Sequence, residues 1–195
     1  MPVRPRLALF DCDGTLADSQ HHILSAMREA FADIGLPAPP LQAIRATIGL
    51  SLPGIAAHLL PDAEEAAQRA LVDAYRARYF AARTAAGAAP EPLYDGMADV
   101  IVGLADAGWL LGIATGKSMR GLVRLLAAHG LSERFVTLQT ADHHPSKPHP
   151  SMCLAALDET GCAAQDTIVI GDTAYDIAMA RAAGALAVGV AWGYH

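Results

Sequence analysis

The chain has 195 residues, of which 53% are hydrophobic and 17% charged, a composition that excludes a disordered protein and allows one substantial core. Its formal net charge of -6, without clustered Lys or Arg, excludes a surface that wraps nucleic acid. The three cysteines are odd in number and form no C-x-x-C pair, which argues against a disulfide framework or a zinc knuckle and fits a reducing cytoplasm.

The first predicted element is a short apolar run near the start of the sequence. It is far shorter than a signal-peptide core or a membrane span, and no later stretch reaches spanning length, so we expect a soluble cytoplasmic protein with no membrane partner. Similar runs follow, each nearly continuous rather than alternating, which is typical of strands buried on both faces of a parallel sheet. The predicted strands are Leu7–Phe10, Trp109–Ala114, Phe135–Leu138, Thr167–Ile170 and Leu186–Val190.

The region after the first run contains no convincing strand pattern. Apolar residues at helical spacing predict an amphipathic helix over Ile23–Ile34, and the alanine-rich stretch 62–86 predicts a long helix. A linker rich in Gly and Pro, 87–92, ends the region. Strands then alternate with helices, which predicts an α/β fold. The predicted organisation is an α/β core formed by residues 1–17 and 93–195, with an all-helical insert at 18–92.

Two carboxylates directly follow the first run, in the motif Asp11-Cys-Asp13-Gly. In an extended backbone, positions i and i+2 point to the same side, so Asp11 and Asp13 should share a cavity. Two like charges this close repel unless a cation or a proton lies between them. Asp-Gly is also a common turn pair, so a turn or a helix cap is the simpler alternative. A functional site predicts more, namely further carboxylates for an oxygen-rich Mg2+ site and cations that hold a phosphate.

Candidates for both lie after other predicted strands. Asp172 and Asp176 follow Thr167–Ile170, although Asp172 could also serve as a helix cap. Ligands of open α/β sheets gather outside the carboxyl ends of the strands, so the four aspartates could converge. The chain has only two lysines: Lys117 directly follows a strand run, and Lys147 lies in a loop whose direction is fixed by prolines.

Four motifs together resemble the ordered motifs of the haloacid dehalogenase-like hydrolase superfamily. A single motif is a weak signal, whereas four in the right order, each closing or following a predicted strand, are highly specific. The insert resembles the cap of the subfamily that contains phosphoglycolate phosphatases and β-phosphoglucomutases. The resemblance implies a Rossmann-like parallel sheet core with an inserted all-helical cap. The motifs are Asp11-Cys-Asp13-Gly-Thr-Leu16, Thr115-Gly-Lys117, Lys147-Pro-His-Pro150 and Gly171-Asp172-Thr-Ala-Tyr-Asp176.

The resemblance also implies an activity, that of a Mg2+-dependent phosphatase acting on a small phosphorylated metabolite in the manner of a phosphoglycolate phosphatase. Asp11 would be the nucleophile that forms an aspartyl-phosphate, and Asp13 would donate and then accept a proton. Mg2+ would be held by Asp11, the backbone carbonyl of Asp13 and Asp172. The phosphate would be bound by Thr115, Gly116 and Lys147. Asp176 would support the metal or orient Lys147.

Several alternative functions share parts of this pattern. The segment Gly112–Ser118 resembles a nucleotide P-loop, but only three residues separate its glycines where four are needed. Asp13 disfavours a dehalogenase, and the absence of lysine from the insert disfavours a phosphonate hydrolase. A phosphomutase of the β-phosphoglucomutase type stays open because it uses the same motifs. A non-catalytic phosphate-binding module is disfavoured by the complete set of motif residues. The histidines interpreted as solvated loop residues rather than metal ligands are His143, His144 and His149.

Substrate specificity is expected to come from the insert. Arg45 precedes the segment Thr47–Ser51, which resembles a specificity loop, and it could bind an anionic group of the substrate or be a surface charge. Gln20 and His21 are further candidate contacts. The sequence leaves open the identity of the substrate, the choice between hydrolase and mutase, and the oligomeric state.

Overall fold

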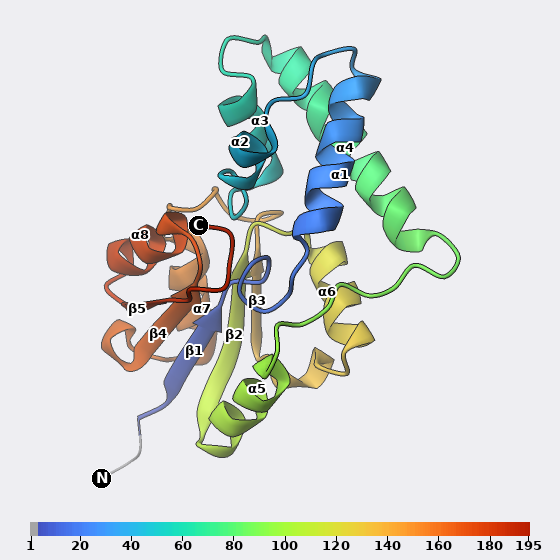
Figure 1. Ribbon diagram of the computed structural model, residues 1–195. Coiled ribbons are helices and arrows are strands. Elements are labelled where there is room, and N and C mark those ends of the chain that lie inside the picture. Colours follow the sequence, from blue (N-terminus) through green and yellow to red (C-terminus); the bar gives the residue numbers. More distant parts are fainter. Residues whose placement is uncertain (1–3) are drawn as a thin grey trace.

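The computed structural model describes residues 4–195, so the first three residues of the predicted core segment 1–17 lie outside the described part. Its centre is a five-stranded sheet with the strand order β3-β2-β1-β4-β5 (Figure 1). All neighbouring strands pair in parallel. The strands are β1 Arg6–Phe10, β2 Trp109–Thr115, β3 Thr137–Thr140, β4 Thr167–Gly171 and β5 Leu186–Gly189.

The predicted parallel sheet is confirmed, and only its third strand differs clearly from the prediction. The apolar run that begins at Phe135 predicted a strand there, but β3 begins at Thr137. A short 3-10 helix at Ser132–Arg134 precedes the strand. The ring of the next residue, Phe135, packs edge-on against Phe10, with 6.4 Å between ring centroids. The apolar character of this residue therefore reflects core packing rather than membership of the strand.

Helices cover both faces of the sheet. Along β1, Ala8 and Phe10 face one hydrophobic cluster, which includes side chains of α5 and α6. Leu7 and Leu9 face the other cluster, which includes side chains of α7 and α8. Burial on both faces explains why the run reads as continuously apolar. These helices are α5 Met97–Asp106, α6 Met119–Ala128, α7 Ser151–Thr160 and α8 Ala174–Ala182.

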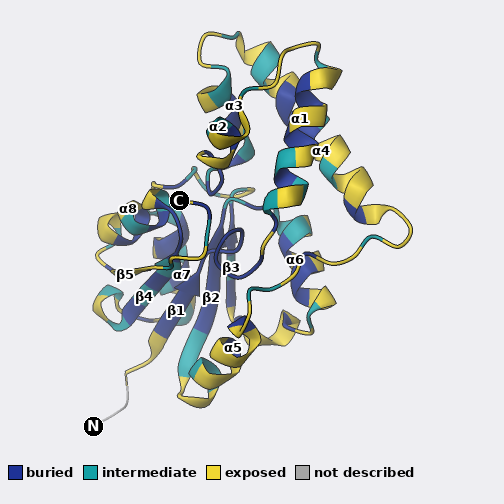
Figure 2. Cartoon of the chain, viewed as in Figure 1, coloured by how far each residue is buried: buried dark blue, intermediate teal, exposed yellow. Residues whose placement is uncertain are grey.

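The insert between β1 and α5 consists of four helices that lie over the carboxyl ends of the strands (Figure 1). Their inward faces share a hydrophobic cluster that includes Met27, Phe31 and Leu71 and is separate from the two clusters of the sheet (Figure 2). The predicted helix from Ile23 and the predicted long helix are both confirmed. The helices are α1 Gln20–Asp33, α2 Leu41–Arg45, α3 Leu52–Leu59 and α4 Glu65–Thr84.

Other sequence predictions concern membranes and cysteines. Across residues 4–195, no helix combines the length and the apolar character needed to cross a bilayer. In the same range, Cys12, Cys153 and Cys162 are free and buried. Burial raises the pKa of the Cys12 thiol, with Asp13 adding to the effect, so Cys12 behaves as a small apolar residue.

Candidate active site

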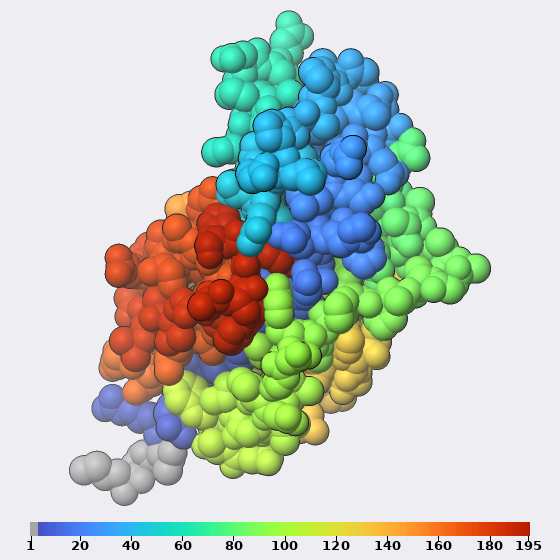
Figure 3. Space-filling model, viewed as in Figure 1, coloured from blue at the N-terminus to red at the C-terminus, as the bar shows by residue number. Residues whose placement is uncertain are grey.

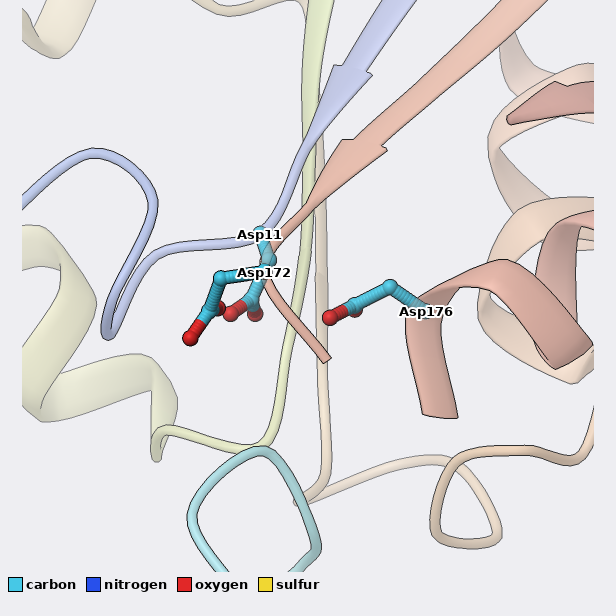
Figure 4. A group of neighbouring side chains, drawn as sticks. All are labelled: Asp11, Asp172 and Asp176. Atoms are coloured by element: carbon cyan, nitrogen blue, oxygen red, sulfur yellow. The ribbon is translucent and has the colours of Figure 1, made fainter. Parts of the chain in front are cut away.

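Two aspartates that follow neighbouring strands and a third in the helix after β4 lie together (Figure 4). Asp11 follows β1, and its amide donates a hydrogen bond to the carbonyl of Ile170 in β4 at 2.8 Å. Asp172 follows β4, and Asp176 lies in the first turn of α8. All three are buried, and one carboxylate oxygen of each lies within 4.8 Å of the others. Such an oxygen-rich group can hold a hard divalent cation.

The Asp11 carboxylate has one satisfied oxygen and one open oxygen. Lys147 Nζ donates to Asp11 Oδ1 at 2.6 Å. The other oxygen, Oδ2, is buried, and no group within residues 4–195 donates to it. Burial raises the pKa of Asp11 to about 8. The charge of Lys147 opposes this rise, and the charges of Asp176 and Asp172 add to it. A buried carboxylate oxygen without a partner is costly, so these residues fit a cation bound at this point.

Lys147 is completely enclosed between two carboxylates. Its Nζ lies 2.6 Å from Oδ1 of Asp11 and 2.6 Å from Oδ1 of Asp176. Burial disfavours the charged form of Lys147, but the attraction of both carboxylates outweighs it, and the pKa of Lys147 is raised. The remaining Asp176 oxygen accepts from the hydroxyl of Thr173 at 2.6 Å, within a capping box at the start of α8. Both oxygens of Asp176 have partners, which suits a residue that orients Lys147.

Asp172 is also fixed on both oxygens. The amide of Tyr194 donates to Asp172 Oδ2 at 2.7 Å, and the hydroxyl of Thr15 donates to Oδ1 at 3.2 Å. Burial raises the pKa of Asp172. Gly14 leaves the space that Asp172 occupies, since its φ is +100° and a Cβ there would lie 2.4 Å from Asp172 Oδ2. The glycine of the Asp13-Gly14 pair therefore also makes room for the Asp172 carboxylate, in addition to allowing a turn.

The Asp13 carboxylate has partners that the sequence did not indicate. Its Oδ1 accepts from Lys117 Nζ at 2.6 Å and from the hydroxyl of Ser19. Lys117 Nζ also lies 3.3 Å from Glu91 Oε2 and donates to the hydroxyl of Tyr79 at 3.0 Å. Burial disfavours the charged form of Lys117, but Asp13, Tyr79 and Glu91 together outweigh it, so the pKa of Lys117 is raised. The only signal for this group in the sequence is a charged residue, Glu91, fixed between two prolines in the linker.

A cavity of about 470 Å³ lies between the insert and the core. Asp11 and Asp13 both line it, together with Thr115 and Gly116 at the end of β2. The amide of Lys117 donates to the Thr115 hydroxyl at 3.1 Å, which places that hydroxyl beside the cavity floor. Among the described residues, Lys147 and Asp172 do not line the cavity and lie beside Asp11 instead. The insert contributes, among others, Ile48, Gly49, Leu50, Tyr75, Tyr79 and Phe80.

The loop between α2 and α3 closes directly over the second motif. A Cβ on Gly116 would lie 2.4 Å from the carbonyl oxygen of Leu50 and 2.9 Å from that of Gly49. Only glycine allows the insert backbone to approach this closely. The segment Thr47–Ser51 therefore lies at the cavity, where a specificity loop is expected.

Three insert residues were predicted to contact the substrate, and none of them, Gln20, His21 or Arg45, is among the described residues that line the cavity. Arg45 is exposed, and its Nε donates to the carbonyl of Tyr194 at 2.9 Å, so it joins α2 to the segment after β5. Gln20 is the first residue of α1.

The histidines of the loop after β3 behave differently from one another. His143 and His149 are exposed, in agreement with the prediction. His144 lies in the same loop but is only partly exposed, and both of its ring nitrogens have partners: Nε2 lies 2.8 Å from Gln139 Oε1 and Nδ1 lies 2.8 Å from the Ser151 hydroxyl. Burial and the neighbouring His143 lower the pKa of His144. This ring connects β3 to the start of α7.

Residues 8–190 match the sequence profile of a family described as haloacid dehalogenase-like hydrolase. The chain belongs to the haloacid dehalogenase-like hydrolase family. It is 38% identical over 192 residues to the "Probable phosphatase IndB" of Dickeya dadantii, covering 97% of this chain and 82% of that one. It is 34% identical over 191 residues to a phosphoglycolate phosphatase of Xanthomonas campestris pv. campestris, covering 97% and 85%.

Solved structures agree with the fold. A structure of a haloacid dehalogenase-like hydrolase from Bacteroides fragilis superposes with a TM-score of 0.88 over 98% of this chain and 90% of the other, at 24% identity. Membership of the haloacid dehalogenase-like hydrolases and the phosphatase names of the relatives make this protein an enzyme, a hydrolase of the phosphatase type. Its buried cluster of Asp11, Asp172 and Asp176 fits a metal site of such an enzyme.

Proposed function

We propose that this protein hydrolyses a small phosphorylated metabolite of the phosphoglycolate type, by Mg2+-dependent phosphoryl transfer to Asp11. The observation that carries the proposal is the buried Asp11 oxygen without a donor, in a carboxylate that lines the cavity and is anchored by Lys147. The relative named phosphoglycolate phosphatase supports the substrate class. The three free, buried cysteines support a reducing cytoplasm as the compartment.

The proposed reaction has two steps. In the first, an Asp11 oxygen attacks phosphorus, the new P–O bond forms, and the P–O bond to the leaving alcohol breaks while Asp13 donates a proton to the departing oxygen. In the second, Asp13 takes a proton from water, the water oxygen attacks phosphorus, and the bond to Asp11 breaks. The products are the alcohol, inorganic phosphate and the regenerated Asp11 carboxylate. Lys147, the Thr115 hydroxyl and the Gly116 amide would bind the non-bridging oxygens.

The metal site would be formed by Asp11, the backbone carbonyl of Asp13 and Asp172. When bound, Mg2+ screens the repulsion between the carboxylate and the phosphate and orients the phosphoryl oxygens. The cluster of hard carboxylate oxygens and the buried Asp11 Oδ2 without a donor among residues 4–195 both support a hard divalent cation here. Asp176 would act on this site through Lys147, which it holds at 2.6 Å.

Residues 18–92 would form a cap that closes over the cavity. Support comes from the separate hydrophobic cluster of the insert and from the close approach of its loop to Gly116. The segments Thr15–Asp18 and Gly87–Pro92 would be the hinges. Cavity-lining residues of the insert, such as Leu50 and Tyr79, would then select the leaving group more directly than Gln20 or Arg45.

A panel of phosphorylated metabolites, assayed with and without Mg2+, tests the proposal. We expect Mg2+-dependent release of inorganic phosphate from the wild type and none from Asp11→Asn. Conversion of a sugar phosphate to its isomer without net phosphate release would instead identify a phosphomutase of the β-phosphoglucomutase type. Binding of phosphate without any turnover of the panel would identify a non-catalytic module.

A further inference from the structure

Tyr194, in the segment after β5, connects the core to the insert. Tyr194 is buried, with 6% of the residue exposed, and belongs to the hydrophobic cluster of the insert although it follows the last strand of the core. Its carbonyl accepts from Arg45 in α2 at 2.9 Å, and its amide donates to Asp172 Oδ2 at 2.7 Å. Figure 3 shows this last segment, in red, lying against the blue and cyan insert.

The hydroxyl of Tyr194 reaches the first linker between core and insert. It accepts a hydrogen bond from the amide of Ser19 at 2.8 Å and lies 3.3 Å from Asp18 Oδ1, an acceptor to which it can donate. Ser19 is the residue directly before α1 and is fully buried. A buried amide needs an acceptor, so the Tyr194 hydroxyl determines where the Ser19 backbone can lie.

Ser19 in turn determines the orientation of Asp13. The Ser19 hydroxyl donates to Asp13 Oδ1, the same oxygen that accepts from Lys117. Both donors bind Oδ1, which leaves Oδ2 of Asp13 free for a proton exchanged with the substrate, and Asp13 is one of the residues that line the cavity. The connection from Tyr194 through Ser19 to Asp13 therefore runs from the buried face of the insert to the group that would handle the proton.

We propose that Ser19 and Tyr194 are positioning residues that hold Asp13 at the leaving-group oxygen when the insert is docked. The proposal rests on the proposed function, because it concerns the proton that Asp13 gives to the departing alcohol. It adds two residues, one before α1 and one after β5, that lie in none of the four motifs. The relay makes proton transfer depend on the position of the insert.

The dependence on the leaving group separates this role from a structural one. An alkoxide needs a proton as it departs, whereas para-nitrophenolate is a stable anion and departs without one. The value of kcat/KM reports the steps up to departure of the alcohol when that step is irreversible. Loss of Asp13 orientation must therefore lower kcat/KM for an alkyl phosphate much more than for para-nitrophenyl phosphate.

The experiment compares phosphoglycolate, or the best alkyl phosphate of the panel, with para-nitrophenyl phosphate. We measure kcat/KM for both substrates with wild type, Ser19→Ala, Tyr194→Phe and the double variant. A reduced folded fraction lowers both values equally and cancels in their ratio. General acid catalysis contributes about 100-fold or more, so we expect a loss of about 10- to 100-fold for the alkyl phosphate and less than about threefold for the aryl phosphate. The double variant should lose no more than Ser19→Ala alone, because both changes act on one relay.

Tyr175→Phe is the matched control. The Tyr175 hydroxyl also joins the core to the insert, since it donates to the carbonyl of Ala46 at 3.3 Å, but it does not contact Ser19. It should leave the alkyl-to-aryl ratio unchanged. Equal losses for both substrates in Ser19→Ala and Tyr194→Phe, or independent losses that multiply in the double variant, overturn the relay. A wild type that hydrolyses neither substrate overturns the proposed function itself, which is a distinct result.

Discussion

Replacing Asp11 by asparagine tests the chemistry and the electrostatics of the site in one variant. The amide keeps the shape of the carboxylate and can still accept from Lys147, but it cannot form a stable acyl-phosphate. Turnover should fall to background while the fold remains. The same change also removes a buried group that titrates, and this predicts an effect on stability that is independent of any substrate.

The size of that effect follows from the pKa of Asp11, which burial raises from 3.8 to about 8 in the metal-free protein. Between these values the folded state holds a proton that the unfolded state has lost, so the free energy of unfolding falls as pH rises. Each pKa unit corresponds to 1.36 kcal/mol. Between pH 5 and pH 8 the wild type should lose about 4 kcal/mol that Asp11→Asn keeps.

Thermal unfolding in EDTA measures this difference. For a chain of this length about 4 kcal/mol corresponds to roughly 8–16 °C in Tm. We therefore expect the Tm of Asp11→Asn minus the Tm of wild type to be larger at pH 8 than at pH 5 by that amount. Mg2+ should raise the Tm of wild type most at pH 8 and should have little effect on Asp11→Asn. Asp158→Asn, at an exposed position of α7, is the control and should follow wild type. Parallel pH profiles of wild type and Asp11→Asn would refute the electrostatic argument, and retained turnover would refute the nucleophile.

Two further substitutions test the surroundings of the site. Gly14→Ala places a Cβ 2.4 Å from Asp172 Oδ2, so we expect about a 100-fold loss of kcat and weaker Mg2+ binding by calorimetry. Gly87→Ala is the control, because Gly87 also has a positive φ but a Cβ there would meet nothing within 4 Å. It should keep the wild-type kcat and Mg2+ affinity. Lys147→Met leaves Asp11 and Asp176 buried without their shared cation and should cost about 3–5 kcal/mol in urea unfolding. Adding Asp176→Asn to Lys147→Met should restore part of the lost free energy of unfolding, because one of the two unpaired buried charges is removed. A double variant less stable than Lys147→Met would contradict this electrostatic explanation.

The parts of the structure that could be predicted from the sequence depend on local patterns. Continuous apolar runs mark the strands because both faces of the sheet are covered, and the carboxyl ends of parallel strands bring Asp11, Asp172 and Asp176 to one edge. Helical spacing likewise marks α1, and an alanine-rich composition marks α4. The shift of β3 was missed because an apolar residue that packs before the strand looks the same as one within it.

The partners of Asp13 could not be predicted, because they depend on how the insert docks. Ser19 and Tyr194 are 175 positions apart, and neither belongs to a motif or a periodic pattern. Arg45 shows the same difficulty in reverse. Its place before a glycine loop left a ligand contact and a surface charge both open, and the docked segment after β5 supplies carbonyl acceptors that the sequence did not indicate. Long-range packing decided both outcomes.

The contact between the insert loop and Gly116 is made by carbonyl oxygens of Gly49 and Leu50. Main-chain atoms are the same whatever side chains the loop carries. Substitutions at Ile48, Leu50 or Leu52 can therefore reshape the cavity while the loop backbone still packs against Gly116. If the proposed function holds, single changes in this loop would alter which substrates fit, while Asp11, Asp13 and Thr115 stay in place.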